Sequence, residues 1–322
     1  MTLIISGISK YYAFQIADRL ISRAGKPFDP ESNKTVLLAA SDGVVALSFT
    51  GPAYIEHTPT DQWIVHTITG KPTALGFSLL PIARHERNLL ANKSKIGGVL
   101  ADLAVAINAA FSSATPPALQ GAFPLRIVAS GWQWQMKRPE RFRPVMYFLG
   151  KESATAPMKC LPSPRHLGAH LCLSQMPFYV PVDQWESLQV DGPQFRNSTQ
   201  WAARLQQLMI SCAGRYPGYI GRALMHIDVL TPRRREVLVH YYADPNKEIL
   251  AEQPRSVFTP WVVDGWHIFP PSEVVGYSEL RLKDWLVRLG TDPQSTCRSI
   301  LGQERKPDPL RPRRPAGPGF LP

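Results

Sequence analysis

The sequence predicts an α+β protein in which antiparallel strand pairs and amphipathic helices occupy separate stretches of the chain. Three observations predict this class. Residues 12–17 alternate in the period of two that is typical of a strand. An Asp-Gly hairpin signal at 42–43 joins two strand-like runs. Residues 99–110 and 201–212 repeat apolar side chains at helical spacing, which favours two core-facing helices.

The N-terminal region reads as a set of short strands. An apolar run at residues 3–8 precedes the alternating run, which ends at Asp18. Residues 25–30, Gly-Lys-Pro-Phe-Asp-Pro, have the composition of a turn. The strand predicted over 44–49 follows the hairpin signal and is closed by Gly51. A helix is expected after it.

Thr2 is the first candidate for chemistry. Removal of Met1 would make Thr2 the N-terminus, and an N-terminal threonine carries its own base, because the free α-amine titrates near neutral pH and lies within reach of the hydroxyl. Asp18 and Lys34 lie sixteen and thirty-two residues further on, each beside a strand-like run. The spacing therefore favours an enzyme with an N-terminal nucleophile.

This order of N-terminal Thr, strand, Asp, turn, Lys, hairpin, strand, Thr50-Gly51 and helix resembles the proteasome β-subunit and its bacterial HslV relatives, within the N-terminal nucleophile (Ntn) hydrolases. The resemblance covers about the first 70 residues. It implies an αββα sandwich of antiparallel sheets between helices, to which this chain adds insertions and a C-terminal extension.

The resemblance also implies a role for each site residue. Thr2 would be the nucleophile, and Lys34 the cation that favours the deprotonated amine and the alkoxide. Asp18 would hold Lys34 through a buried ion pair, and the Gly51 N–H would donate to the tetrahedral oxyanion. The implied activity is hydrolysis of a peptide or other amide bond, by a homo-oligomer that needs no cofactor or metal. Whether an ATPase partner is required stays open.

The loop after the second predicted helix departs from the family. Proteasome subunits usually place an Asp and a Ser there, whereas residues 215–221 offer Tyr216 and Tyr219. The strand pair expected at 223–230 and 236–242 is compatible with the family. A noncatalytic chain that keeps the fold for assembly or binding is therefore the first alternative.

The net charge of +11 raises a second alternative, a basic protein associated with nucleic acid. The basic cluster at 233–235 is interpreted as a solvated hairpin tip. Trp132 and Trp134 lie near Arg141 and Arg143, but this segment is more typical of an exposed hairpin whose tryptophans lean on the core. Because no nucleic-acid motif accompanies the charge, this alternative is disfavoured.

The composition divides the chain into several parts. We expect one proteasome-like domain over residues 1–245, interrupted by a Pro-rich insertion near 151–195 that has no clear periodicity. Residues 246–300 would form an added C-terminal element packed on the core, with a helix-like stretch at 280–289. Residues 301–322, rich in Pro and Arg, are expected to be a disordered tail.

Cysteine, histidine and hydropathy patterns limit the remaining classes. The four cysteines lie far apart and predict reduced or buried thiols. His166, His170 and Cys172 have a spacing that could serve zinc, but Pro and Gly around them argue against the helix that would align them. No apolar run is long enough for a membrane span, and the N-terminus lacks the pattern of a signal peptide, so the cytoplasm is expected.

Overall fold

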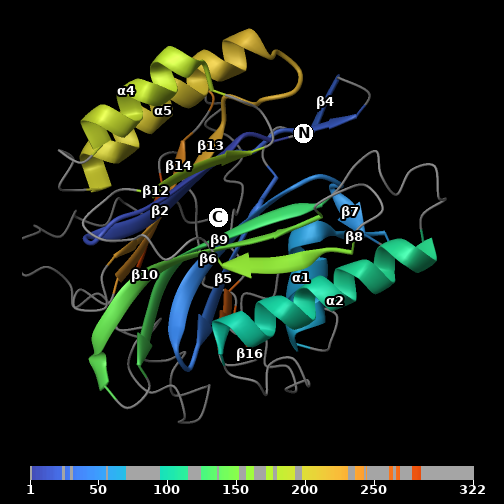
Figure 1. The fold of residues 1–322 in the computed structure, drawn as a ribbon. Helices are drawn as coiled ribbons and strands as arrows, with labels where there is room; N and C mark the ends of the chain where they lie inside the picture. Colours follow the sequence, from blue (N-terminus) through green and yellow to red (C-terminus); the bar gives the residue numbers. More distant parts are fainter. Residues whose placement is uncertain are drawn as a thin grey trace, which may run out of the picture.

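Two large β-sheets, two two-stranded hairpins and four helices make up the described part of the chain (Figure 1). The structure is a computed structural model. It describes residues 2–23, 26–29, 32–55, 57–69, 95–114, 125–135, 138–151, 157–162, 172–176, 180–192, 198–230, 236–242, 244, 261–263, 266–268 and 278–283.

One sheet has six strands. They are β1 (Ile4–Ile8), β2 (Tyr12–Asp18), β12 (Cys172–Met176), β13 (Leu224–Leu230), β14 (Glu236–Tyr242) and β17 (Ser278–Lys283). Their order across the sheet is β12-β1-β2-β13-β14-β17, and every neighbouring pair is antiparallel. β1 and β2 therefore lie inside the sheet, where both edges of each strand are hydrogen-bonded.

The other sheet has seven strands. They are β5 (Thr35–Ala40), β6 (Gly43–Thr50), β9 (Arg126–Gln135), β10 (Arg138–Gly150), β11 (Lys159–Pro162), β15 (Trp261–Val263) and β16 (Trp266–Ile268). Their order is β11-β10-β9-β6-β5-β15-β16, and all pairs are antiparallel except β15 with β5, which run parallel. The hairpin signal at 42–43 joins β5 to β6, as the sequence predicts.

Helices cover the outer face of each sheet (Figure 1). They are α1 (Thr60–Thr69), α2 (Ile96–Ala114), α4 (Val182–Asp191) and α5 (Ser198–Arg215). Figure 1 shows α4 and α5 over the six-stranded sheet and α1 and α2 over the seven-stranded sheet. The predicted α+β class with antiparallel sheets is confirmed.

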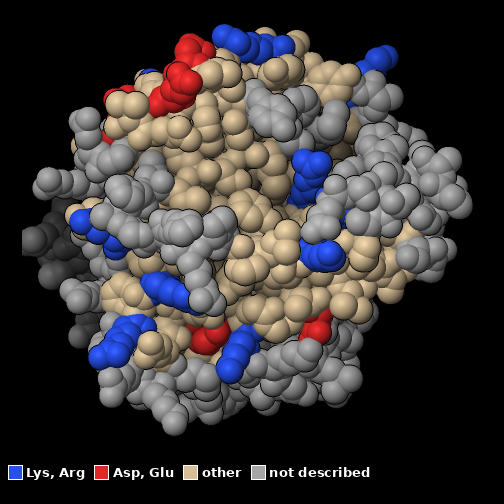
Figure 2. Space-filling view, viewed as in Figure 1, with Lys and Arg blue, Asp and Glu red and all other residues tan. Residues whose placement is uncertain are grey.

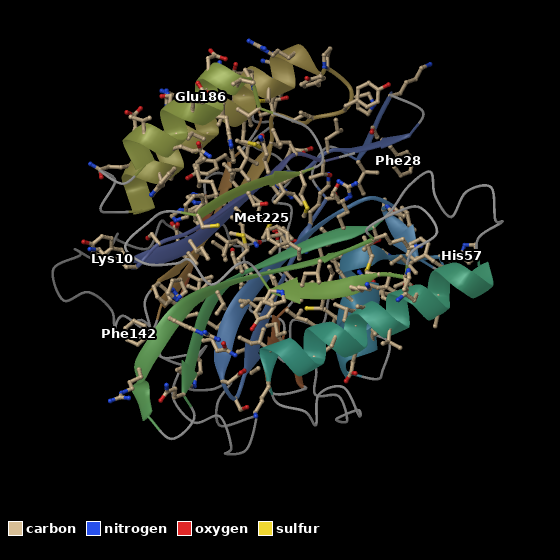
Figure 3. All side chains as sticks on the ribbon, viewed as in Figure 1. Lys10, Phe28, His57, Phe142, Glu186 and Met225 are labelled. Carbon is tan, nitrogen blue, oxygen red and sulfur yellow. The ribbon has the colours of Figure 1, made fainter. Side chains whose placement is uncertain are left out.

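Apolar side chains fill the three spaces between these layers. The cluster between the sheets joins Ile4, Ile8 and Met225 of one sheet to Val44 and Trp132 of the other. Figure 3 labels Met225 in this central layer. Two further clusters lie under the helices, one beneath α1 and α2 and one beneath α4 and α5. Burial of this much apolar surface is the main force that holds the sheets together.

The two tryptophans of the β9–β10 hairpin belong to the core. Trp132 and Trp134 are 1% and 7% exposed, and the Trp132 ring packs edge-on against Phe142 at 5.5 Å between centroids. The Trp132 Nε1–H donates to the Val229 carbonyl oxygen at 2.8 Å, across to the other sheet. The prediction that these rings lean on the core is confirmed.

A series of hydrogen-bonded polar side chains also connects the two large sheets. The Gln15 Nε2–H of β2 donates to the Val128 carbonyl oxygen at 3.0 Å. Ser48 Oγ donates to Gln15 Oε1 at 2.5 Å and lies 2.8 Å from Thr35 Oγ1. All these side chains are buried. Because the buried amide is bonded at both ends, it fixes the position of β2 relative to β5, β6 and β9.

Several local predictions are wrong. Residues 26–29, predicted as turn, form β4 (Lys26–Asp29), which pairs with β3 (Ile21–Arg23). Strand β17 occupies the start of the stretch predicted as helix over 280–289, because its residues complete the sheet beside β14. Helix α4 lies in the segment where the sequence shows no periodicity. The 301–322 tail and the basic cluster at 233–235 lie outside the described residues.

Among the described residues on the face shown in Figure 2, the basic side chains are scattered and form no single patch. None of the described helices combines the length and apolar character that a bilayer crossing requires.

Candidate functional site

A cavity of about 670 Å³ lies beside the start of β1. Two hairpins border it: β3–β4 on one side, and β7 (Tyr54–Ile55) with β8 (Thr58–Pro59) on the other. Figure 3 labels one residue of each hairpin, Phe28 and His57. Thr2, Lys34 and Gly51 all line the cavity. The fold thus brings together three residues that lie far apart in the sequence.

Thr2 is almost fully buried, with 3% of its surface exposed. It lies immediately before β1, and its carbonyl oxygen accepts a hydrogen bond of 3.4 Å from Thr50 Oγ1 at the end of β6. Its own hydroxyl Oγ1 accepts a hydrogen bond from the Lys34 ammonium. The hydroxyl is therefore held at the cavity wall by contacts from the seven-stranded sheet.

Lys34 is the cation of this site. It precedes β5, is 5% exposed, and its Nζ donates to both Thr2 Oγ1 and the Leu20 carbonyl oxygen. The same Nζ lies 3.7 Å from Asp18 Oδ2. A buried ammonium needs such partners, because removing an unpaired charge from water costs several kcal/mol.

Asp18 lies behind Lys34 and is fully buried. Its Oδ1 accepts from the Leu3 N–H at 2.7 Å, and its Oδ2 accepts from the N–H groups of Leu20 at 3.1 Å and Gly221 at 3.0 Å. Burial raises the pKa of the Asp18 carboxyl, while the Lys34 charge and the three N–H groups act in the opposite direction. The Asp18 carboxylate, at the end of β2, is therefore hydrogen-bonded both to the start of β1 and to the loop before β13.

Gly51 lines the cavity just after β6. Its φ of 128° lies in a region that side chains with a Cβ rarely adopt, so the backbone here requires glycine. This placement is compatible with close approach of a substrate to the backbone. The roles of Thr2, Asp18, Lys34 and Gly51 in catalysis stay predictions.

The loop 215–221 contributes in a way that the sequence analysis missed. Acidic or hydroxyl side chains were expected there and the loop offers Tyr216 and Tyr219, whereas a backbone group, the Gly221 N–H, contacts Asp18. A Cβ at Gly221 would lie 2.6 Å from the Leu20 Cβ, so this close approach needs glycine. Tyr219 lines the cavity and is 41% exposed. The two glycines of this short loop, Gly218 and Gly221, were the available signal.

Asn33 and Asp61 form a second polar feature of the cavity that the sequence analysis missed. Asn33 Nδ2 donates to Asp61 Oδ2 at 3.0 Å and to the Thr35 carbonyl oxygen at 2.8 Å. The Asn33 Oδ1 atom is buried and has no hydrogen-bond partner among the described residues. Burial raises the pKa of the Asp61 carboxyl, and hydrogen bonds from Asn33 and the helix backbone oppose this.

Another buried carboxylate lies on the six-stranded sheet, away from the cavity lining. Asp228 Oδ1 is 3.3 Å from His226 Nε2, and its Oδ2 is 4.0 Å from His240 Nε2. Asp228 and His226 are at most 1% exposed. Among the described residues, no group of His, Cys, Asp and Glu has a geometry suited to a metal ion. His166 and His170 lie outside those residues.

Comparison with known proteins finds solved structures that resemble this chain weakly. No family model matches the chain, and no curated protein matches it. A solved Anbu mutant from Hyphomicrobium sp. strain MC1 is 11% identical, with 71% of this chain and 82% of that chain covered and a TM-score of 0.46.

Two further structures are similar to the same degree. Anbu, an ancestral β-subunit, from Yersinia bercovieri is 8% identical, with 71% and 81% covered and a TM-score of 0.42. The helical assembly of the Anbu complex from Pseudomonas aeruginosa is 7% identical, with the same coverage and a TM-score of 0.43.

These findings correct one prediction. Membership of the proteasome β-subunit and HslV family of Ntn hydrolases is wrong as predicted, because no family model matches and the similar structures are Anbu proteins. The predicted resemblance depended on a few positions in the first 70 residues, which is too little sequence to define a family. The site must therefore be judged from its own geometry.

Proposed function

We propose that the chain is a hydrolase that cleaves peptide or other amide bonds, with Thr2 as its nucleophile after removal of Met1. One observation supports this most strongly: the Lys34 ammonium contacts the Thr2 hydroxyl inside a cavity, and the buried Asp18 carboxylate backs that ammonium. A cation beside a hydroxyl favours its deprotonated form, which is the form that attacks.

In the proposed reaction, Thr2 Oγ attacks the substrate carbonyl carbon and its proton passes to the free α-amine of the same residue. Lys34 stabilises the developing negative charge on Oγ, and the Gly51 N–H donates to the carbonyl oxygen as it becomes an oxyanion. The amine then protonates the leaving nitrogen as the C–N bond breaks, which leaves an ester on Thr2. Water activated by the amine hydrolyses this ester and restores the hydroxyl.

The proposal is tested by covalent labelling with a β-lactone probe, combined with intact-mass measurement of the N-terminus. We expect the mature chain to begin at Thr2 and to carry one probe adduct. Thr2→Ala should abolish the adduct without loss of folding, and Thr2→Ser should retain part of it. Ser22→Ala is the matched control, because Ser22 supplies another hydroxyl to the same cavity. Retention of Met1, or equal labelling of Thr2→Ala, contradicts the proposal.

A noncatalytic role in assembly or binding is the second candidate function. The loop 215–221 favours it, because it presents the exposed ring of Tyr219 to the cavity instead of an acidic or hydroxyl side chain. Wild-type protein that begins at Thr2, resists the probe and cleaves no peptide library would favour this role. Self-association, measured by analytical ultracentrifugation, tests the proposed homo-oligomer in either case.

A further inference from the structure

We propose that the cavity selects substrates that carry an ammonium or guanidinium group near the scissile carbonyl, and that Asn33 and Asp61 bind this cation. The inference rests on the proposed hydrolase and names its substrate class. Both side chains line the cavity that also contains Thr2. A substrate with its carbonyl at Thr2 would therefore extend its neighbouring side chain into the space that Asn33 and Asp61 border.

Asn33 lines this space and holds an acceptor that lacks a donor among the described residues. Its Nδ2 donates to Asp61 Oδ2 and to the Thr35 carbonyl oxygen, and these two acceptors fix the orientation of the amide. The remaining atom, Oδ1, is buried and has no hydrogen-bond partner among the described residues. Because a buried acceptor without a donor is costly, a ligand N–H placed here would gain a strong hydrogen bond.

Asp61 supplies the charge. Among the described residues that line the cavity, Lys34 and Asp61 are the charged ones. Lys34 already contacts Thr2 and the Leu20 carbonyl oxygen and lies near Asp18, whereas Asp61 is held by neutral donors, Asn33 and the helix backbone. A substrate cation is therefore the partner that would balance Asp61. Charge-assisted hydrogen bonds of this kind are roughly twice as strong as neutral ones.

The cavity also suits the apolar stem of a basic side chain. Tyr54 and Tyr219, which are 50% and 41% exposed, both line it. Lysine and arginine bury their methylene stems against such surfaces, and a cation near an aromatic face gains further attraction. The aromatic side chains thus match the apolar stem of a basic substrate side chain, and the Asn33–Asp61 pair matches its charged end.

Asp61 also lies in the first turn of α1, where any carboxylate stabilises the helix N-terminus. A control must separate this role from substrate binding. Asp183 provides it, because it occupies the same second position in α4, is exposed, and does not line the cavity. Asp61→Asn and Asp183→Asn remove one charge each from equivalent helix positions.

The test uses fluorogenic peptides that differ only in the residue before the scissile bond: arginine, lysine, citrulline, leucine or glutamate. Citrulline has the shape of arginine without its charge. We expect wild-type kcat/KM to be at least about tenfold higher for arginine than for citrulline, the size of one charge-assisted hydrogen bond. Asp61→Asn should remove this ratio while the leucine peptide changes less than about twofold, and Asp183→Asn should keep the ratio. Melting curves check that each variant is folded.

Two results separate the inference from the proposal on which it rests. Equal cleavage of the arginine and citrulline peptides overturns the cation site and leaves the hydrolase intact. If no peptide is cleaved, the hydrolase proposal fails, and calorimetry with arginine amide and citrulline amide then tests the site alone. Tighter binding of arginine amide that Asp61→Asn abolishes supports the site, and equal binding overturns it.

Discussion

Asp18 and Asp228 are two buried carboxylates on neighbouring strands of one sheet, yet their surroundings differ. In the β2–β13 register, Asp18 pairs with Leu224 and Asp228 with Phe14. The alternation of side chains places both carboxylates on the face toward α4 and α5. Asp18 accepts three backbone N–H bonds and lies 3.7 Å from a lysine, whereas Asp228 faces two histidines.

The difference concerns where the partner side chain points. Lys34 Nζ lies 3.7 Å from Asp18 and also donates to the Thr2 hydroxyl at the cavity wall. The Asp228 group is enclosed by Phe14 and the neighbouring rings and points no charge toward the cavity. Burial alone thus does not distinguish the two carboxylates, whereas the direction in which their partners point does.

The largest expected effect is the loss of Asp18. Asp18→Ala leaves Lys34 without its counter-charge and three N–H groups without an acceptor, so unfolding free energy should fall by about 3–5 kcal/mol. Asp228→Ala should cost less, about 1–3 kcal/mol, because no backbone N–H bond to its carboxylate is lost among the described residues. Urea unfolding measures both. Equal losses would mean that the two clusters are energetically alike.

Gly221 offers a second way to disturb only the Asp18 cluster. Gly221→Ala places a Cβ 2.6 Å from the Leu20 Cβ, and the resulting shift of the loop should destabilise the fold by about 1–3 kcal/mol. Gly214→Ala is the control, because its Cβ meets nothing within 4 Å inside α5. That variant should be stabilised by about 0.5–1 kcal/mol. A Gly221→Ala protein as stable as wild type would show that the loop is not tightly held.

The pH dependence of stability tests whether burial, or the Lys34 charge with the N–H donors, dominates the pKa of Asp18. Because burial raises the folded pKa above its ordinary value of 3.8, the native state binds this proton more tightly than the unfolded state. The stability of wild type relative to Asp18→Asn should therefore fall as pH rises from 3.8 toward the folded pKa, by at most about 1.4 kcal/mol per pH unit, and then level off. A rise over this window would mean that Lys34 and the N–H donors outweigh burial.

Cys160 shows how burial alone, without a charged partner, changes the pKa of a side chain. Burial raises the pKa of its thiol from 9.0 to about 11. At pH 8 about one thiol in a thousand is then the reactive thiolate, so iodoacetamide should modify Cys160 slowly, and the rate should rise toward pH 11. Peptide mapping by mass spectrometry gives this rate without any expected change in stability. Rapid modification at pH 8 would mean that the thiol is more accessible than its surroundings indicate.

The strands of the N-terminal half were predictable because their signals are local. Alternation over 12–17 and the hairpin at 42–43 both correspond to observed strands, and helical spacing predicted α2 and α5. Residues 26–29 and β17 were not predictable in this way. Their strand structure depends on distant partners, since β17 pairs with β14 some forty residues earlier in the chain.

The residues whose side chains form the candidate site could be proposed from the sequence. Thr2, Asp18, Lys34 and Gly51 could be proposed from residue type and spacing, and the fold places Asp18 and Lys34 within 3.7 Å. The Gly221 N–H was missed because a backbone donor leaves no side-chain signal, and the glycine itself was the only trace of it. The Asn33–Asp61 pair was missed because residues twenty-eight positions apart meet only after β5, β6 and α1 have packed together.

The hydrogen-bonded Gln15 side chain has a mechanical consequence for the cavity. Two stacked sheets with purely apolar faces can slide past each other at little cost, because dispersion contacts have no direction. Gln15 is bonded both to Val128 and to Ser48 on the opposing sheet, and a slide of one residue would break both bonds at once. The two large sheets are therefore held against shear. The β3–β4 and β7–β8 hairpins belong to neither of these sheets, so the Gln15 hydrogen bonds do not restrain them directly.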